Sequence, residues 1–346
     1  MLSIQALRGI AALSVILCHC RFFPDGWIGV DLFFCLSGFL IASIHFRDIG
    51  NPAKAQPFAL KRFIRIYPLL FVFLLGWTGL RLGRGLLGLG WHTDELDGKL
   101  FWEGIPPTLF MLPTLYTNQR ALFVSWTLAY ECLFYAAFWL AILGGKRIAH
   151  TLFWGWLALI VGFNLLGGPP HSAWQTPFNT HILEFLCGVA ASRLPLRHSA
   201  ATLAGALLLL TAVGLGGLIQ CSTPQAYPLA NGFGPFFLAS KACLGVAIAA
   251  LILGCVGLEN RGRLPLPPFL LTLGDASYSL YLSHELVIMT VHQFAKWLSL
   301  APFLDRLLGC LISVVTGLLL YRWIEKPMLK AFRTRLLKKA PPVPAS

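Results

Sequence analysis

Two residues suited to acid–base and phosphate chemistry lie in the first apolar run of the sequence, over about residues 4–22. Arg8 and His19 are eleven residues apart, so a helix places them on one face, about 16 Å apart along its axis. An imidazole takes a proton near neutral pH, and a guanidinium binds phosphate through paired hydrogen bonds. On spacing alone, an arginine that reaches lipid phosphates and a histidine that closes a loop explain the pattern equally well.

The second apolar run, over about residues 27–46, contains Asp31 near its start and then Ser37 and Gly38. Asp31 and Gly38 share a helix face, and the missing side chain of Gly38 lets a neighbouring helix or a ligand approach. Asp31 can belong to a site, or it can cap the helix at a water interface. The sequence leaves both interpretations open.

Arg62 and Arg65 follow this run in the segment Lys61-Arg62-Phe-Ile-Arg65. Residues three apart are neighbours on a helix, and two guanidinium groups side by side suit phosphate recognition. The same charges are also typical of ordinary cytoplasmic loops of membrane proteins.

A carboxylate, Glu131, interrupts a later apolar run, on one helix face with Thr127 and Tyr135. In an apolar environment such a group must pair, stay protonated or face water. Glu131 is therefore a candidate site residue.

A polar stripe of Ser277, Tyr281 and His284 lies in the ninth apolar run. Such a stripe faces a bundle interior or a water-filled cavity rather than lipid. His181 and Glu184 begin the sixth run, where we expect them at the membrane interface.

Helices across a membrane must position these residues. Only 12% of the 346 residues are charged and 57% are apolar, against about 25% charged residues in soluble domains. These values exclude a soluble enzyme, a disordered chain and a disulfide-rich secreted domain, and they predict an all-α polytopic transmembrane helix bundle. Segment 101–116 contains three prolines and is expected to be a surface or re-entrant segment. The ten predicted spans are 4–22, 27–46, 66–80, 124–143, 151–167, 180–194, 201–219, 235–257, 268–292 and 303–323.

The net charge of +13 is explained by the predicted membrane topology. With both termini cytoplasmic, 19 of the 27 Lys and Arg residues fall on the inner side, which is the usual bias of membrane proteins. This pattern argues against nucleic-acid binding. The nine cysteines show no metal-binding spacing, and no metal is expected.

We expect one membrane domain over residues 1–335 and a basic, proline-rich tail over 336–346. The Lys and Arg residues after Trp323 are expected to contact anionic lipid headgroups.

Five motifs occur in an order that resembles the acyltransferase 3 family of integral membrane acyltransferases. They span nearly the whole chain. The motifs are Leu7-Arg8-Gly9-Ile-Ala11 with His19, Gly29-Val-Asp31-Leu-Phe-Phe through Leu36-Ser37-Gly38-Phe39, Arg62-Phe-Ile-Arg65-Ile-Tyr-Pro68, Ser125-Trp126-Thr-Leu-Ala-Tyr-Glu131 and Ser277-Tyr278-Ser-Leu-Tyr281-Leu-Ser-His284.

The resemblance implies about ten spans in a bacterial inner membrane. It implies transfer of an acyl group, often acetyl, from cytoplasmic acyl-coenzyme A to a hydroxyl, usually of an envelope carbohydrate. Arg8 and His19 match the family's Arg-x10-His motif, and Arg62 and Arg65 match its Arg-x-x-Arg motif. Some members add an extracytoplasmic esterase-like domain, and we expect none here.

These implications and the chemistry of the residues assign roles. Arg8, Arg62 and Arg65 are predicted to bind the phosphates of acyl-CoA. His19 is predicted to be the general base, with Asp31 or Glu131 orienting its ring. His284 is an alternative base, and Ser37, Tyr281 and His284 are predicted to contact substrate.

A transporter or exporter of a small polar or acylated molecule is the main alternative, because polar stripes in membrane helices also mark transport paths. The sequence has no visible inverted repeat to support it. A non-catalytic membrane scaffold would not need His19 or Glu131. Acceptor identity, chain length of the acyl group and oligomeric state are not encoded in these motifs.

Overall fold

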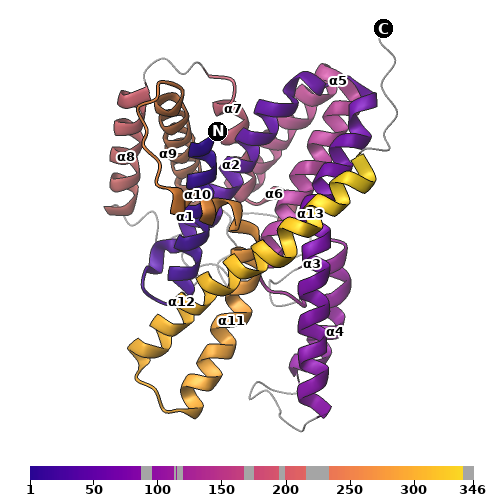
Figure 1. Cartoon of the computed structure of the whole chain (residues 1–346). Coiled ribbons are helices and arrows are strands. Elements are labelled where there is room, and N and C mark those ends of the chain that lie inside the picture. Colours follow the sequence, from indigo (N-terminus) through magenta and orange to yellow (C-terminus); the bar gives the residue numbers. More distant parts are fainter. Residues whose placement is uncertain are drawn as a thin grey trace.

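A computed structural model describes residues 1–86, 96–112, 114, 120–166, 175–194, 199–215 and 234–337 of the chain. Every regular element in these ranges is a helix, and the helices pack as one bundle (Figure 1). The prediction of an all-α helix bundle is confirmed. Most of the predicted tail, 336–346, lies outside the described residues.

Thirteen α-helices, joined by short 3-10 and π-helical turns, make up the described ranges. The α-helices are α1 (Leu2–His19), α2 (Ile28–His45), α3 (Ala55–Leu86), α4 (Leu96–Leu109), α5 (Ser125–Leu165), α6 (Gln175–Phe178), α7 (His181–Ala191), α8 (Ser199–Leu215), α9 (Pro235–Asn260), α10 (Pro268–Asp275), α11 (Ser277–Trp297), α12 (Pro302–Leu320) and α13 (Lys326–Phe332).

Six helical segments within the described ranges are long and apolar enough to cross a membrane. Two shorter apolar helices, His181–Ala191 and Ala200–Thr211, accompany them. The six are Leu2–His19, Pro24–Asp48, Pro52–Gly83, Ser125–Leu165, Pro235–Asn260 and Pro302–Leu336.

Each of the ten predicted segments falls on a helix, but the boundaries differ. Segments 124–143 and 151–167 form the two arms of α5, which are separated at Gly145, where φ is 83°. Segment 268–292 is divided into α10 and α11 at Ala276. Residue 167 of the fifth segment and residues 216–219 of the seventh lie outside the described residues, and helix α4 ends inside the expected re-entrant segment.

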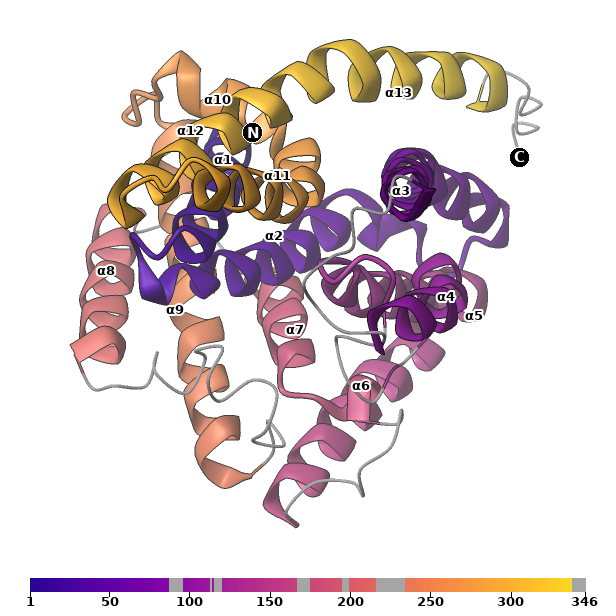
Figure 2. The same cartoon turned by 90° about the horizontal axis from the view of Figure 1, so that it is seen from below.

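Helix α2 runs through the middle of the bundle, as the view from below shows (Figure 2). It packs closely on α7 because each of the two helices has a glycine that faces the backbone of the other helix. A Cβ atom at Gly38 would lie 2.1 Å from the carbonyl oxygen of Phe185, and one at Gly188 would lie 2.0 Å from that of Cys35. The expectation that Gly38 admits a neighbouring helix is confirmed.

The C-terminal helices cross one side of this bundle obliquely, from α11 towards α3 (Figures 1 and 2). Helix α12 continues through a π-helical turn, η6 (Tyr321–Glu325), into α13 and a second π-helical turn, η7 (Arg333–Leu337). Such π-helical turns are uncommon and often occur at functional sites.

Candidate active site

A cavity of about 720 Å³ opens where α1, α2, α3, α5, α11 and the C-terminal helices meet. Its volume suits a ligand of cofactor size. The side chains around it are basic, aromatic and hydroxyl-bearing, with two carboxylates among them. They include Gln5, Arg8, Phe33, Phe34, Ser37, Arg62, Arg65, Thr127, Glu131, Tyr135, Asp275, Ser277, Tyr278, Tyr281, Tyr321, Lys326, Lys330 and Arg333.

Three arginines predicted to bind phosphate, Arg8, Arg62 and Arg65, all line this cavity. Arg62 lies over the ring of Tyr135, with 5.5 Å between the guanidinium carbon and the ring centroid. Arg65 lies over the ring of Tyr278 at 5.2 Å. Aromatic faces hold guanidinium groups in place and leave their N–H groups at the edge for a ligand.

Arg65 has a second partner, which the sequence did not reveal. Its Nη1 donates a hydrogen bond of 2.7 Å to Oε1 of Glu325, which is buried. This ion pair joins α3 to the C-terminal helices.

Glu131 lies on the cavity wall, with Thr127 and Tyr135 on the same face as predicted. The hydroxyl of Ser37 donates to Glu131 Oε1 at 3.2 Å, and the hydroxyl of Tyr135 donates to the same oxygen. The structure thus brings together two predicted site residues from α2 and α5.

Tyr281 leads from this cavity to two histidines. Its ring lines the cavity and lies 5.7 Å from the ring of His284 between centroids. The ring of His284 lies 4.7 Å from that of His19, edge to face. The two predicted candidate bases are therefore neighbours, and they lie next to a residue of the cavity wall, Tyr281.

Backbone carbonyl groups fix the tautomer of both rings. His19 Nδ1 lies 2.9 Å from the carbonyl oxygen of Val15, and His284 Nδ1 lies 2.7 Å from that of Tyr281. A carbonyl oxygen only accepts, so each Nδ1 carries a hydrogen, and in the neutral ring Nε2 then keeps its lone pair. Within the described chain, Nε2 of His284 is buried without a hydrogen-bond partner.

This arrangement differs from the expectation that Asp31 or Glu131 orients His19. The carbonyl of Val15 holds the imidazole instead. Glu131 accepts hydrogen bonds from Ser37 and Tyr135, and Asp31 belongs to a separate cluster.

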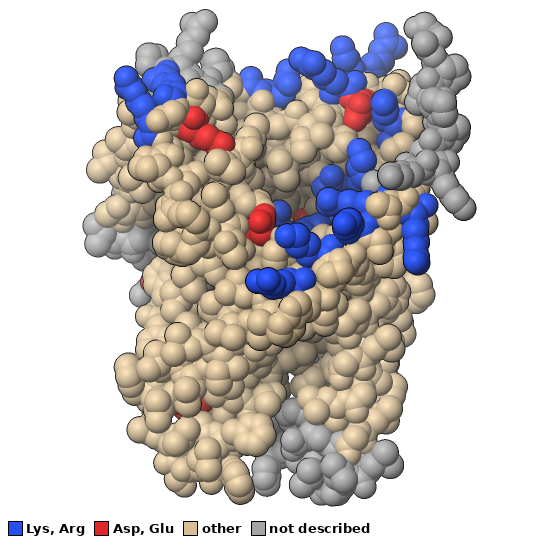
Figure 3. All heavy atoms as spheres, in the orientation of Figure 1, with Lys and Arg blue, Asp and Glu red and all other residues tan. Residues whose placement is uncertain are grey.

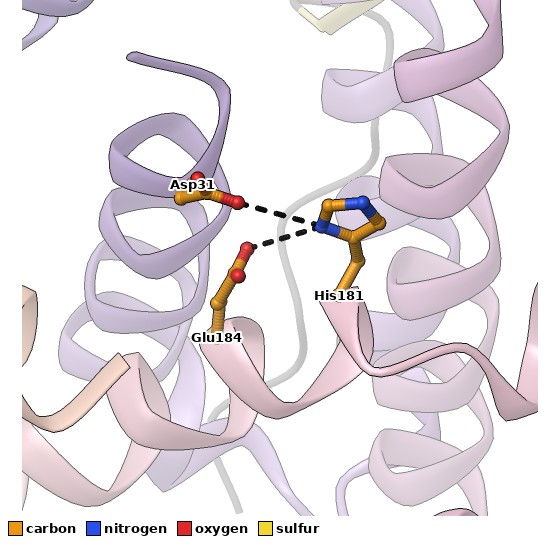
Figure 4. Close-up of side chains that lie close together, drawn as sticks. All are labelled: Asp31, His181 and Glu184. Carbon is orange, nitrogen blue, oxygen red and sulfur yellow. Dashed lines mark hydrogen bonds and ion pairs between the residues drawn. The ribbon is translucent and has the colours of Figure 1, made fainter. Parts of the chain in front are cut away.

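That cluster, called here the buried quartet, consists of Asp31 on α2, His181 and Glu184 on α7 and Lys241 on α9. Figure 4 shows the carboxylates of Asp31 and Glu184 directed at the His181 ring. Nδ1 of His181 lies 3.5 Å from an oxygen of each. Asp31, His181 and Glu184 have exposed fractions of 2%, 3% and 0%, so all three side chains are buried inside the bundle.

Lys241 supplies the positive charge of the buried quartet. Its ammonium donates to Asp31 Oδ1 and lies 3.2 Å from Glu184 Oε1. Asp31, His181 and Glu184 have the ligand types and spacing of a metal site, but a lysine ammonium between the two carboxylates already provides their counter-charge. The chemistry of the set therefore fits an ion-pair network rather than a cation site.

Sequence reasoning could have found part of this cluster. Lys241 lies inside the predicted span 235–257, where a charged residue requires a partner. Its partner Asp31 lies 210 positions away along the chain, and helix periodicity carries no information about that distance.

Comparisons with known proteins agree with this architecture. The model of the family described as "Acyltransferase domain" matches residues 1–322. No solved structure matches the chain.

Curated relatives share about a quarter of their residues with the chain. Acyltransferase MdmB of Streptomyces mycarofaciens is 27% identical over 99% of this chain and 95% of its own length. Exopolysaccharide production protein ExoZ of Rhizobium meliloti is 28% identical over 90% of this chain and 92% of its own length. A putative peptidoglycan O-acetyltransferase, YrhL of Bacillus subtilis, is 27% identical over 94% of this chain, which spans 54% of YrhL. Because the family match covers nearly the whole chain, the protein belongs to the acyltransferase 3 family of membrane acyltransferases.

Proposed function

We propose that this protein is a membrane O-acyltransferase that moves an acetyl group from cytoplasmic acetyl-CoA to a hydroxyl of an envelope carbohydrate. One observation supports this proposal above all others. One cavity is lined by Arg8, Arg62 and Tyr281, and behind the Tyr281 ring lie the rings of His284 and His19, each packed against the next.

This sequence of groups fits the shape of acyl-CoA. The donor carries phosphates at one end and a thioester at the end of a long, thin arm. The guanidinium groups of the arginines that line the cavity suit the phosphates, because they form charge-assisted hydrogen bonds with them. We propose that the arm follows the aromatic wall formed by Phe33 and Tyr281 and that the thioester lies next to Tyr281, whose ring packs against His284.

The proposed reaction uses one histidine in two steps. Nε2 removes the proton of the acceptor hydroxyl while the oxygen attacks the thioester carbonyl carbon. The tetrahedral adduct then collapses, the carbon–sulfur bond breaks, and the imidazolium returns the proton to the leaving sulfur. The products are an O-acyl ester and free CoA thiol, and no oxidant, reductant or metal is required.

His19 is better placed than His284 to be this base. The acceptor must reach the base, and His19 is half-buried whereas His284 is completely buried. His284 then contributes as the neighbour that packs against the His19 ring. We propose that Glu131 shapes the donor cavity with Ser37 and Tyr135 rather than orienting the base.

The side of the membrane follows from charge. In Figure 3, Lys and Arg side chains on this face gather toward the end where the N-terminus and the last described residues of the C-terminal helices lie. Basic residues collect on the cytoplasmic side of membrane proteins. We therefore propose that the cavity opens to the cytoplasm, where acyl-CoA is found, and that both termini lie there.

The acceptor class rests on the names of relatives. One is an exopolysaccharide production protein, and another is a putative peptidoglycan O-acetyltransferase. Both names refer to bacterial envelope glycans. The acceptor proposed here is accordingly a hydroxyl of an envelope polysaccharide or of its lipid-linked precursor.

The test is transfer of label from [acetyl-¹⁴C]-CoA to glycan in membrane vesicles with the protein in defined orientation. We expect ester-linked label that mild alkali releases, and loss of most of it with His19→Gln. The matched control is His292→Gln, because His292 is exposed and pairs with Asp305 at 2.7 Å, away from the cavity.

Two results would contradict the proposal. The first is binding of acetyl-CoA without any release of CoA thiol in the presence of glycan. The second is movement of an intact acylated compound across the vesicle membrane with no new ester, which would favour an exporter.

A further inference from the structure

The C-terminal helix adds a second group of cations to the cavity, beyond the family match that ends at residue 322. Lys326, Lys330 and Arg333, called here the C-terminal stripe, all line the cavity. Figure 3 shows Lys and Arg side chains along α13, beside a hollow in this face. From sequence, these charges are expected only to contact anionic lipid headgroups.

The spacing of the C-terminal stripe places it on one helix face. Positions i, i+4 and i+7 fall within about 60° of one another around a helix, so they point to the same side. Arg335 lies about half a turn away from this face and does not line the cavity. The helix therefore turns one basic face to the cavity and another to its surroundings.

All three side chains of the C-terminal stripe are exposed. Within the described ranges, no carboxylate forms an ion pair with them. The acidic residues of the cavity are engaged elsewhere, because Asp275 accepts a hydrogen bond from Gln5 and Glu131 from Ser37. The C-terminal stripe is consequently an uncompensated positive rim.

The position of this helix is fixed from inside the bundle. Glu325, only 1% exposed, accepts hydrogen bonds from Arg65 at 2.7 Å and from the hydroxyl of Ser279 at 2.6 Å. The buried carboxylate immediately precedes Lys326 in the chain. Because the buried Glu325 holds the helix in place, the exposed cations that follow it are already positioned before a ligand binds.

The cavity thus takes its cations from two parts of the chain. Arg8, Arg62 and Arg65 come from α1 and α3, and the C-terminal stripe comes from α13 and η7. Coenzyme A has two separate phosphate groups, a diphosphate within the chain and a monoester on the ribose. Two cation groups at one cavity match this pattern, whereas a simple acyl phosphate would need only one.

We propose that the C-terminal stripe is a phosphate subsite that binds the ribose 3′-phosphate of the donor, while the arginines of α1 and α3 bind its diphosphate. This inference rests on the proposed function, because it takes acyl-CoA as donor. Its consequence is selectivity: the enzyme prefers CoA over 3′-dephospho-CoA.

The experiment measures binding of acetyl-CoA and of acetyl-3′-dephospho-CoA to the full chain in neutral detergent, by calorimetry. The wild type should bind acetyl-CoA about ten- to a hundredfold more tightly, the effect of one or two charge-assisted hydrogen bonds. Lys330→Gln with Arg333→Gln should abolish this preference and leave affinity for the dephospho compound unchanged. Arg335→Gln is the matched control and should keep the preference.

A second arm separates donor phosphate from lipid phosphate. The same variants are measured in nanodiscs with and without anionic phosphatidylglycerol, and the preference of the wild type should persist in both. If the double variant alters lipid binding but keeps the nucleotide preference, the C-terminal stripe is a lipid site and the proposal is overturned.

The remaining outcomes are equally decisive. Equal affinity of the wild type for both nucleotides would overturn the subsite and leave the proposed function standing. Failure of the wild type to bind either nucleotide would overturn both, since the donor would then not be a CoA ester. Thermal unfolding of each variant confirms that the exposed substitutions leave the fold intact.

Discussion

The cavity and the buried quartet both contain ionisable groups inside the bundle, but the charges of the quartet are paired with one another whereas most cations of the cavity are not. In the buried quartet, the ammonium of Lys241 lies against Asp31 and 3.2 Å from Glu184, and all members are nearly inaccessible. At the cavity, cations from three parts of the chain face a common space with few acids among them.

The difference separates stability from function. Charges that are buried and paired with one another join α2, α7 and α9. Cations that face a cavity and have few acidic partners attract an anionic ligand. The same contrast holds for histidines, because His181 lies between two carboxylates whereas His19 is held at Nδ1 by the Val15 carbonyl and has no ion pair with the described residues.

The largest expected effect compares these two histidines. His19→Gln removes the proposed base, and general base groups contribute about 10²- to 10⁴-fold in rate. His181→Gln keeps hydrogen bonding within the buried quartet and should leave turnover per folded molecule within a few-fold of wild type. The measurement is release of CoA thiol with glycan acceptor, normalised to protein that elutes as a folded species.

Equal loss of turnover in His19→Gln and His181→Gln would contradict the distinction between the cavity and the buried quartet. It would mean that the buried quartet belongs to the reaction centre. Donor affinity of His19→Gln should stay near that of the wild type, because His19 does not line the cavity.

The second expected effect is on stability. Lys241→Met leaves two buried carboxylates without their cation, and removal of one partner from a buried ion pair costs about 3–5 kcal/mol. The expected result is a lower unfolding midpoint in detergent, with donor affinity preserved in the fraction that remains folded. Adding Asp31→Asn and Glu184→Gln should recover much of the loss, because the remaining groups are then neutral.

An exposed lysine provides the control for this prediction. Lys296, at the end of α11, is exposed and lies in no ion pair with the described residues, so Lys296→Met should leave the unfolding midpoint unchanged. A stable Lys241→Met variant would show that the buried quartet holds no essential charge balance.

The third expected effect is on donor binding alone. Arg62→Gln removes a cavity cation whose guanidinium rests on Tyr135. Loss of a charge-assisted hydrogen bond should weaken acetyl-CoA binding about tenfold or more. Arg47→Gln, at an exposed position outside the cavity, should bind the donor as the wild type does. Unchanged affinity in Arg62→Gln would show that the charge serves topology only.

Helix periodicity predicted much of the cavity because its residues recur on helix faces. Thr127, Glu131 and Tyr135 share one face of α5 and all line the cavity, and Arg62 and Arg65 do the same on α3. The fold class followed from composition, since so few charges cannot solvate a soluble domain of this length.

Contacts between distant helices could not be predicted in this way. Nothing in the local sequence connects Lys241 with Asp31, or Glu325 with Arg65, because these pairs join residues 210 and 260 positions apart. The face that α13 turns to the cavity depends on the π-helical turn at Tyr321–Glu325, which shifts the helix phase. A stripe at i, i+4 and i+7 was visible in the sequence, but its direction was not.

The smallest expected effect concerns the anchor of that stripe. Glu325→Gln keeps an oxygen that accepts from Ser279 but removes the charge that pairs with Arg65. Absolute affinity is a poor readout, because the released Arg65 charge favours phosphate while a less firmly held α13 disfavours it. The preference for acetyl-CoA over its 3′-dephospho form isolates the second effect, since Arg65 belongs to the diphosphate group. We expect this preference to fall about two- to fivefold, equivalent to roughly 0.5–1 kcal/mol.

The control for this last change is Asp305→Asn, which removes an ion pair of the same length at the far end of the C-terminal helices. Asp305 pairs with His292 at 2.7 Å, so its loss disturbs α12 without touching the cavity. Its preference should equal that of the wild type. An undiminished preference in Glu325→Gln would show that packing of α12 and α13 fixes the C-terminal stripe without the ion pair. A preference lost completely would show instead that the buried anchor, and not the lysines themselves, decides which nucleotide the cavity accepts.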